Sequence, residues 1–282
     1  MSMARNKLES ITSELARWRG WVQAGFLLAW LDPWMLRMHT VCSPVFHCYS
    51  CPMATFACPI GVLANFSALH LFPFAVVGLL VVLGAIFSSF VCGWACPFGF
   101  LQDLIAKIPT PKFALPAWMG AGRYIVLAVF VLAIPYWYGE ASPLFFCRLC
   151  PAGAIEAALP NTIQQAIKGN PLVWPTATKL IILAVFLVAA FFTWRPWCTV
   201  ICPLGAIYGL FNHVSFFFLR FHAKRCGGCS ECRSLCVDGG RSEHRVDGLR
   251  CVRCMECTKC HAVSVSTILT TDNTPNKLNI QG

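Results

Sequence analysis

The chain carries two cysteine-rich runs, CGGCSECRSLC at residues 226–236 and CVRCMECTKC at residues 251–260, and these runs decide its fold class. The first spaces its cysteines as Cys-x2-Cys-x2-Cys-x3-Cys, and the second as Cys-x2-Cys-x2-Cys-x2-Cys. Three cysteines spaced in this way hold an iron–sulfur cube, and a fourth from the other run completes it. This crossover predicts two clusters with the following ligands: Cys226, Cys229, Cys232 and Cys260 for one, and Cys251, Cys254, Cys257 and Cys236 for the other.

Zinc is the alternative, because structural zinc sites also use paired Cys-x2-Cys motifs. A zinc ion needs four ligands and gains nothing from a third evenly spaced cysteine in each run, so two [4Fe-4S] clusters are preferred. The runs resemble the bacterial two-cluster ferredoxin domain over about the last sixty residues. Val237 and His261 stand where that domain usually has a proline after its fourth cysteine, and the last gap is one residue short.

The composition indicates a membrane protein. Of the 282 residues, 57% are hydrophobic and only 12% are charged, which leaves too little polar surface to cover a soluble globule of this size. Eighteen cysteines in a secreted chain would suggest disulfides, but disulfide scaffolds are short and poor in long apolar runs. The net charge of +10 is interpreted as positive-inside anchoring in lipid, and no nucleic-acid motif is present in the sequence.

Four apolar stretches are long enough, or nearly so, to cross a hydrocarbon core that requires about 20 helical residues. We place them near residues 20–38, 69–91, 121–138 and 176–197. The expected organisation is an amphipathic lead over 1–19, a membrane domain over 20–204, an interfacial helix over 205–222, a ferredoxin-like domain over 223–266 and a flexible tail over 267–282.

Basic residues predict the orientation. Residues 38–70, between the first two spans, contain no Lys or Arg, whereas the lead has four basic residues and the C-terminal part is densely basic. Basic segments stay on the cytoplasmic side. We therefore expect a multi-pass protein of a bacterial-type inner membrane, with both termini and the ferredoxin-like domain in the cytoplasm. Thiolate ligands also survive best on that reducing side.

The membrane domain contains an internal repeat. SPVFHCYSCP at residues 43–52 aligns without gaps with SPLFFCRLCP at residues 142–151, and CGWACPFG at residues 92–99 matches CTVICPLG at residues 198–205. We therefore expect a duplicated two-span unit with about four transmembrane helices and repeats near 20–99 and 121–205. Repeats in one orientation are related by an axis along the membrane normal, so equivalent motifs meet at the same face.

The repeated cysteine pairs predict further metal sites. Thiolates three or four residues apart lie on one helical face, and the following proline suits the first turn of a helix whose amides favour an anionic cluster. The alternative is that these cysteines are small buried hydrophobic residues. The preferred prediction is two four-cysteine iron–sulfur sites: Cys48, Cys51, Cys147 and Cys150 near the outer face, and Cys92, Cys96, Cys198 and Cys202 near the inner face.

Cys42 and Cys58 have no counterpart in the second copy, where Ala141 and Ala157 align with them. CPIG at 58–61 nevertheless repeats the Cys-Pro-x-Gly pattern, so a second register with Cys51 and Cys58 as ligands stays open. Haem ligation is a further alternative, although the sequence contains no Cys-x2-Cys-His motif. Its candidate ligands near the span ends are His39, His47, His70 and His213.

Four spans, two Cys-x3-Cys-Pro motifs and a C-terminal two-cluster ferredoxin domain resemble the NapH- and NosR-type family of polytopic membrane ferredoxins. The resemblance covers residues 20–262. It implies electron transfer between the quinone pool and partner redox subunits that carry iron–sulfur clusters or cytochromes. It does not explain the outer Cys-x2-Cys-Pro pairs, Cys42 or Cys58.

We therefore predict a membrane-embedded electron-transfer subunit that passes electrons between the ferredoxin-like domain, membrane clusters and the quinone pool or a partner subunit. Arg148, inside the outer motif, is either a stabiliser of a reduced cluster or an interfacial anchor. The sequence contains no recognisable nucleophile constellation or phosphate loop. Two other classes stay open: a quinol dehydrogenase in its own right, and a maturation, metal-handling or redox-sensing factor that binds copper or cycles its thiols.

Overall fold

The computed structural model describes residues 2–30, 42–46, 48, 56–169, 171, 175–222, 236, 247–260 and 262–268. The described chain is mostly helical, as predicted. Several residues singled out in the sequence lie outside the described part: Cys51, Cys226, Cys229, Cys232, His39, His47 and most of the predicted tail.

The α-helices are, in chain order, α1 (Ser2–Trp30), α2 (Pro59–Ala68), α3 (Phe74–Ile86), α4 (Pro97–Ala106), α5 (Gly122–Ile125), α6 (Ile134–Tyr138), α7 (Phe146–Leu149), α8 (Leu159–Ile167), α9 (Ala177–Phe192) and α10 (Pro203–Phe211). The π-helical segments are η1 (Val91–Ala95), η3 (Val126–Ala133), η4 (Gly153–Ala158) and η5 (Trp197–Ile201). The segments η2 (Ala117–Ala121) and η8 (Glu256–Lys259) are 3₁₀-helical. The strands are β1 (Phe217–Phe221) and β2 (Val263–Thr267).

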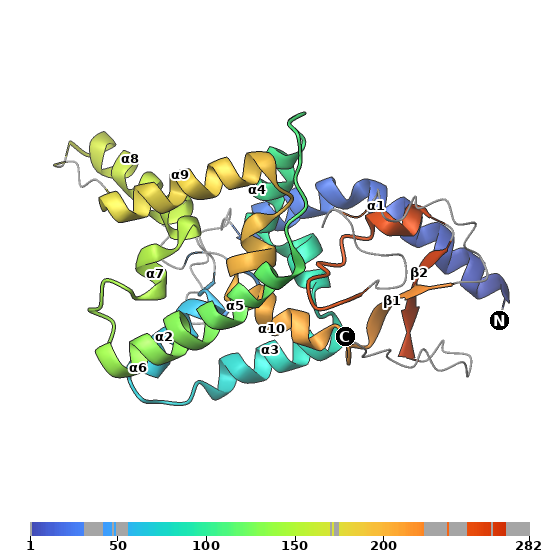
Figure 1. The fold of residues 1–282 in the computed structure, drawn as a ribbon, viewed down its shortest axis with the longest axis horizontal. Helices are drawn as coiled ribbons and strands as arrows, with labels where there is room; N and C mark the ends of the chain where they lie inside the picture. The colour runs from blue at the N-terminus through green and yellow to red at the C-terminus, as the bar shows by residue number, and fades with distance from the viewer. Residues whose placement is uncertain are drawn as a thin grey trace.

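The small antiparallel sheet lies at one end of the long axis, and α6 and α7 lie at the other (Figure 1). Its register pairs Leu219 with Val265. The interfacial helix predicted over 205–222 differs from the structure, because α10 ends at Phe211. Asn212 follows the helix and turns its side chain to the backbone of Gly248, and the aromatic strand β1 then pairs with β2.

Helix α1 runs without a break through the predicted lead and the start of the first predicted span. Its buried side chains Ala16, Arg19 and Gln23 recur at three- and four-residue intervals, so they share one face. That face contacts η1 and α4 of the first repeat. The part of the predicted span after Trp30 lies outside the described residues.

Among the described residues, one helix is long and apolar enough to cross a membrane. It covers Trp118–Tyr138 and contains the predicted span over 121–138. Helices α3 and α9 are shorter than the spans predicted over 69–91 and 176–197. Pro73 precedes α3, and Ser88, which follows the C-terminal end of α3, adopts a φ of 51°. Arg195 likewise follows α9 and adopts a φ of 43°. These turns end the helices before the cysteine motifs.

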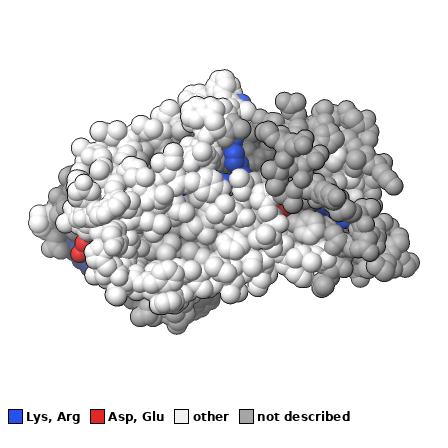
Figure 2. Space-filling model, turned by 60° about the horizontal axis from the view of Figure 1, so that its bottom comes forward, with Lys and Arg blue, Asp and Glu red and all other residues white. Residues whose placement is uncertain are grey.

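Charged side chains are few on the face drawn in Figure 2. Large apolar side chains are exposed on the outer helices, among them Phe74 on α3, Trp137 on α6 and Ile181 on α9, which are 79%, 73% and 63% exposed. The interior cluster of apolar side chains includes cysteines from both repeats, Cys58, Cys92, Cys96, Cys150 and Cys202. The cysteines therefore face inward while the helices present apolar side chains outward.

Candidate metal centre

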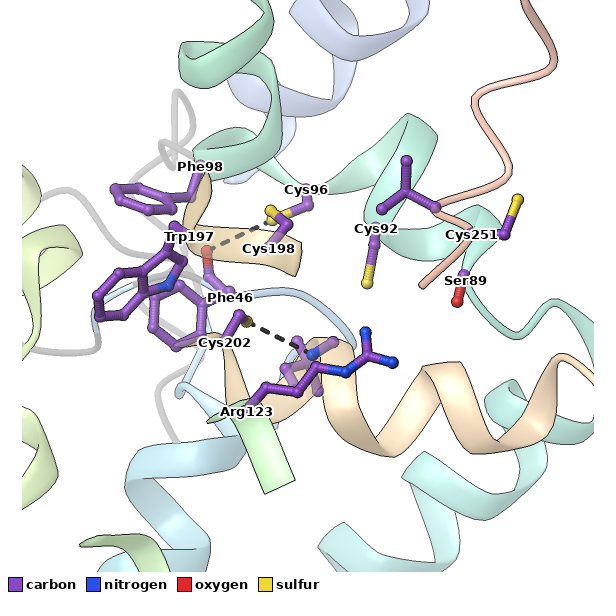
Figure 3. Close-up of a pocket in the computed structure, with 13 residues that line it drawn as sticks. Phe46, Ser89, Cys92, Cys96, Phe98, Arg123, Trp197, Cys198, Cys202 and Cys251 are labelled. Carbon is purple, nitrogen blue, oxygen red and sulfur yellow. Dashed lines mark hydrogen bonds between the residues drawn. The ribbon is translucent and has the colours of Figure 1, made fainter. Parts of the chain in front are cut away.

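Cys92, Cys96, Cys198 and Cys202, here called the inner thiol site, line one cavity (Figure 3). All four are buried, with exposed fractions between 4% and 6%. Cys202 interacts electrostatically with the other three, so the four sulfur atoms share one environment. The structure thus brings together the set of cysteines that the internal repeat predicted at the inner face.

The two Cys-x3-Cys-Pro motifs fold alike. In each, the first cysteine lies in a π-helical turn, η1 or η5, and the second is the N-cap of the next helix. Cys96 has φ −77° and ψ 119°, and Cys202 has φ −63° and ψ 114°. Pro97 and Pro203 occupy the first turn, where the missing N–H costs nothing.

The glycine of each Cys-Pro-x-Gly motif is fixed by close packing. A Cβ added to Gly99 would lie 2.9 Å from the Cys92 carbonyl oxygen, and one added to Gly205 would lie 2.9 Å from the Cys198 carbonyl oxygen. The Gly205 N–H donates to the Cys202 sulfur over 3.4 Å. A thiolate there receives both this hydrogen bond and the positive end of the helix dipole.

Polar groups around the cavity suit an anionic ligand. Arg123 is 2% exposed, and Figure 3 shows its guanidinium group facing the sulfur of Cys92. Its Nη2 donates to the Leu249 carbonyl oxygen over 2.8 Å, while its buried Nε has no hydrogen-bond partner among the described residues. Gln102 Nε2 donates to the Cys198 sulfur over 3.1 Å. A buried cation beside four thiols requires negative charge, which a thiolate-ligated cluster supplies.

A set of four thiols could hold either an iron–sulfur cluster or a single metal ion. Within the described part of the chain, no three His, Cys, Asp or Glu side chains converge closely enough to hold one metal ion. A zinc ion would draw four sulfur atoms to about 2.3 Å from one point. Burial raises the pKa of the Cys96 thiol to about 12, so coordination would have to release its proton.

A second cavity is lined by Cys236, Cys251, Cys254 and Cys257, here called the ferredoxin site. Cys257 interacts electrostatically with the other three. These are the four residues that the crossover between the two runs predicted for one cluster. The predicted partners of Cys260 lie outside the described residues, and Cys260 itself is buried against Ala262 and Val263.

The two cavities adjoin each other, because Cys251 and Val252 line both. The backbone of η1 comes close to the same segment: a Cβ added to Gly93 would overlap the Val252 carbonyl oxygen. Trp94 Nε1 also donates to the Arg253 carbonyl oxygen over 3.1 Å. The inner thiol site is therefore separated from the ferredoxin site by little more than one backbone segment.

A buried ion network that sequence reasoning missed ties these parts together. Arg195 Nε donates to Asp103 Oδ1 over 2.6 Å, and its Nη1 donates to the Cys92 carbonyl oxygen over 3.1 Å. Arg19 pairs with the same carboxylate and reaches Glu256 of η8 over 3.7 Å. Burial opposes ionisation of Asp103, but the two guanidinium groups outweigh it and hold its pKa below the usual value. No local pattern in the sequence marks residues so far apart.

The structure also brings together Cys48, Cys147 and Cys150 of the predicted outer site, and Cys58 joins them. Cys51 lies outside the described residues. His70 is exposed and packs against Tyr136, and His213 is exposed, so neither is directed at a buried cofactor site. The Arg148 side chain is also exposed.

Grouped cysteines at helix N-termini, buried cations and a two-stranded cysteine-rich segment are features expected of an iron–sulfur protein of the ferredoxin type. Comparisons with known proteins agree. A profile of the 4Fe-4S binding domain matches the chain twice, over residues 69–116 and 177–225. Each matched segment contains one Cys-x3-Cys-Pro motif of the inner thiol site.

Three relatives are similar to part of the chain. The chain is 28% identical over 55% of its length to the putative electron transport protein YccM of Escherichia coli. It is 28% identical over 64% of its length to the methylamine utilization ferredoxin-type protein MauN of Methylobacillus flagellatus. It is 29% identical over 51% of its length to the regulatory protein NosR of Stutzerimonas stutzeri.

The matches cover 43%, 60% and 19% of these three proteins, so the chain spans less than two thirds of each. No solved structure matches the chain. The chain is thus similar to a 4Fe-4S binding domain and to relatives named as ferredoxin-type, electron-transport and NosR proteins, in agreement with the resemblance that its cysteine motifs suggested.

Proposed function

We propose that the chain is a membrane-embedded electron-transfer subunit in which the inner thiol site holds a [4Fe-4S] cluster beside the cluster of the ferredoxin site. The proposal rests on the observation that Cys251 and Val252 line both cavities, so the two sites are adjacent. What a bound cluster supplies is reversible one-electron transfer: one site is oxidised as its neighbour is reduced. Spacing, charge and exclusion of water are the contributions of the protein.

The proposed ligands follow the grouping of the thiols. Cys92, Cys96, Cys198 and Cys202 would hold the inner cluster, and Cys236, Cys251, Cys254 and Cys257 one ferredoxin cluster. The second ferredoxin cluster is proposed on Cys226, Cys229, Cys232 and Cys260, from the spacing of the two runs.

Charged and polar residues would set the potentials of the two sites. Arg195 lines the ferredoxin site and interacts electrostatically with Cys198 and Cys254, one ligand from each set. A buried cation favours the more negative, reduced form of a cluster, so Arg195 would make both sites easier to reduce. The carboxylate of Asp103 moderates this effect, and Gln102 stabilises the charge on the Cys198 sulfur.

Aromatic side chains continue from the inner thiol site toward the opposite end of the molecule. Phe46 and Trp197 both line the inner cavity, with ring centroids 6.2 Å apart. Phe46 lies 6.3 Å from Phe146, the residue before Cys147. Phe98 packs between Phe46 and Phe186 at 5.8 and 5.0 Å. This packed, dry interior would separate the inner and outer cysteines without admitting water.

The proposed membrane location rests on several observations. Residues 118–138 form a helix long and apolar enough to span a bilayer, with 28% of its most apolar window buried. The exposed apolar side chains of α3, α6 and α9 suit lipid contact. The scarcity of Lys and Arg over 38–70 favours a cytoplasmic ferredoxin-like domain. Quinone or a partner redox subunit is proposed as the other electron carrier, from the family resemblance.

Quinol-dependent bleaching of the cluster absorbance tests the proposal on the purified full chain. A reduced quinol analogue is added to wild type, to Cys92→Ala/Cys198→Ala and to the control Cys42→Ala. We expect bleaching in wild type and in the control, and a rate at least tenfold lower in the double variant. Equal rates in all three proteins, or no bleaching in wild type by quinol, would contradict the proposed path to the quinone pool.

A further inference from the structure

The sequence contains four Cys-Pro-x-Gly motifs, and the structure gives their cysteines one backbone conformation. Their φ angles lie between −63° and −77°, and their ψ angles lie between 114° and 125°. In each motif the backbone N–H of the glycine lies on the side of its cysteine, and that of Gly205 donates a hydrogen bond to the Cys202 sulfur over 3.4 Å. The four cysteines are Cys58, Cys96, Cys150 and Cys202.

Two of these cysteines, Cys96 and Cys202, belong to the inner thiol site, one from each repeat. The other two, Cys58 and Cys150, would form the equivalent pair at a second site. Cys51 does not share the motif, because the sequence continues Pro52-Met53-Ala54 and has no glycine three residues on. The sequence match between SPVFHCYSCP and SPLFFCRLCP aligns Cys51 with Cys150. The shared backbone conformation instead makes Cys58 the counterpart of Cys150.

The contacts of Cys58 agree with this assignment. Cys150 interacts electrostatically with Cys48, Cys58 and Cys147, and Cys58 interacts with Cys147. Backbone pairing joins the two segments of the first repeat, since Ser43 N–H donates to the Ala57 carbonyl oxygen over 2.8 Å. Cys58 is 8% exposed and Cys150 is 7% exposed. The outer thiol site is thus Cys48, Cys58, Cys147 and Cys150.

The outer thiol site also has a cation, as the inner one does. A Cβ added to Gly153 would lie 3.6 Å from the Cys48 sulfur, from the Lys179 Nζ and from the Cys147 carbonyl oxygen. Lys179 interacts electrostatically with Cys147. An ammonium group beside four thiols suits an anionic, thiolate-ligated cofactor. Glu156 accepts the Cys48 backbone N–H over 2.7 Å and so fixes the position of that ligand.

We propose that Cys58, and not Cys51, completes a four-thiolate iron–sulfur site with Cys48, Cys147 and Cys150. The inference rests on the proposed function only in the identity of the cofactor, since the ligand set follows from the matched Cys-Pro-x-Gly geometry. A single copper or zinc ion on the same thiols is the competing occupant.

Iron, acid-labile sulfide, copper and zinc are measured on the purified full chain, with EPR spectra of the reduced protein. The variants are Cys58→Ala, Cys51→Ala and Cys42→Ala. Cys58→Ala is expected to lose about four irons and one EPR component. Cys51→Ala and Cys42→Ala are expected to keep the wild-type content. Retention of the EPR signals of the ferredoxin-like domain shows that each variant is folded.

Full iron content in Cys58→Ala, or loss of the same irons in Cys51→Ala, would overturn the ligand assignment. Stoichiometric copper or zinc that Cys58→Ala removes would overturn the cluster assignment. A Lys179→Gln variant adds an independent readout, because removal of the cation should lower the reduction potential of the outer component alone. None of these results depends on the inner thiol site. The proposed function is tested separately, with the Cys92→Ala/Cys198→Ala variant.

Discussion

The junction between the inner thiol site and the ferredoxin site is tested by replacing Gly93 with alanine. A Cβ at this position would overlap the Val252 carbonyl oxygen and lie 3.2 Å from the Arg253 carbonyl oxygen. Both neighbours are backbone atoms, so no side chain can rotate away, and one segment has to shift. Overpacking of this kind costs about 1–3 kcal/mol.

Gly78→Ala is the matched control. Gly78 lies inside α3, and no atom of the described residues is within 4 Å of its added Cβ. There the substitution stabilises the helix by about 0.5–1 kcal/mol, because alanine loses less conformational entropy. The stability difference between the two variants should therefore be about 1.5–4 kcal/mol.

The assay is the midpoint temperature at which detergent-solubilised protein loses its visible cluster absorbance, at one fixed heating rate because cluster loss is irreversible. Gly93→Ala should bleach at a clearly lower temperature than wild type, and Gly78→Ala at the wild-type temperature or above. Equal midpoints for the two variants would refute the close approach of η1 to the Val252 segment.

Two buried ion pairs lead to further predictions. Arg253 is fully buried and bidentate on Asp247, with N–O distances of 2.6 and 2.8 Å. Arg253→Met should therefore cost about 3–5 kcal/mol of stability, because it leaves the buried Asp247 charge without its partner. The Arg253→Met/Asp247→Leu double variant should recover most of that loss in the same thermal assay, and an equal loss in both variants would contradict this reasoning. Asp103→Asn removes the counter-charge of Arg195 and should raise the reduction potential of the inner site in an EPR-monitored titration, whereas Glu140→Gln, an exposed change of equal charge, should leave it unchanged.

Much of the cysteine chemistry could be predicted from sequence, because spacing and repetition are local properties. The crossover between the two runs predicted the four residues that line the ferredoxin site, and the internal repeat predicted the four that line the inner thiol site. The Asp103 network was not predictable in this way. Its members lie on α1, α4 and the turn after α9, and only the tertiary fold brings them together.

The proposed outer site differs by one cysteine from the site that the alignment of the two repeats predicts. Ten residues around Cys51 match the second copy without a gap, and this match outweighed the four-residue CPIG pattern at Cys58. The shorter pattern carries the backbone conformation, since both its proline and its glycine have steric roles at a helix start. Helix ends were also hard to predict, because the turns at Ser88 and Arg195 use left-handed conformations in residues that rarely adopt them.

The central claim is that the inner thiol site holds an iron–sulfur cluster next to the ferredoxin site. Iron and sulfide content with EPR of the reduced full chain tests it, on wild type beside Cys92→Ala/Cys198→Ala. We predict that the double variant loses about four irons and one EPR component, and that the signals of the ferredoxin-like domain remain. A wild-type content near eight irons that the double variant leaves unchanged would contradict the claim, because the ferredoxin-like domain alone would account for all the metal.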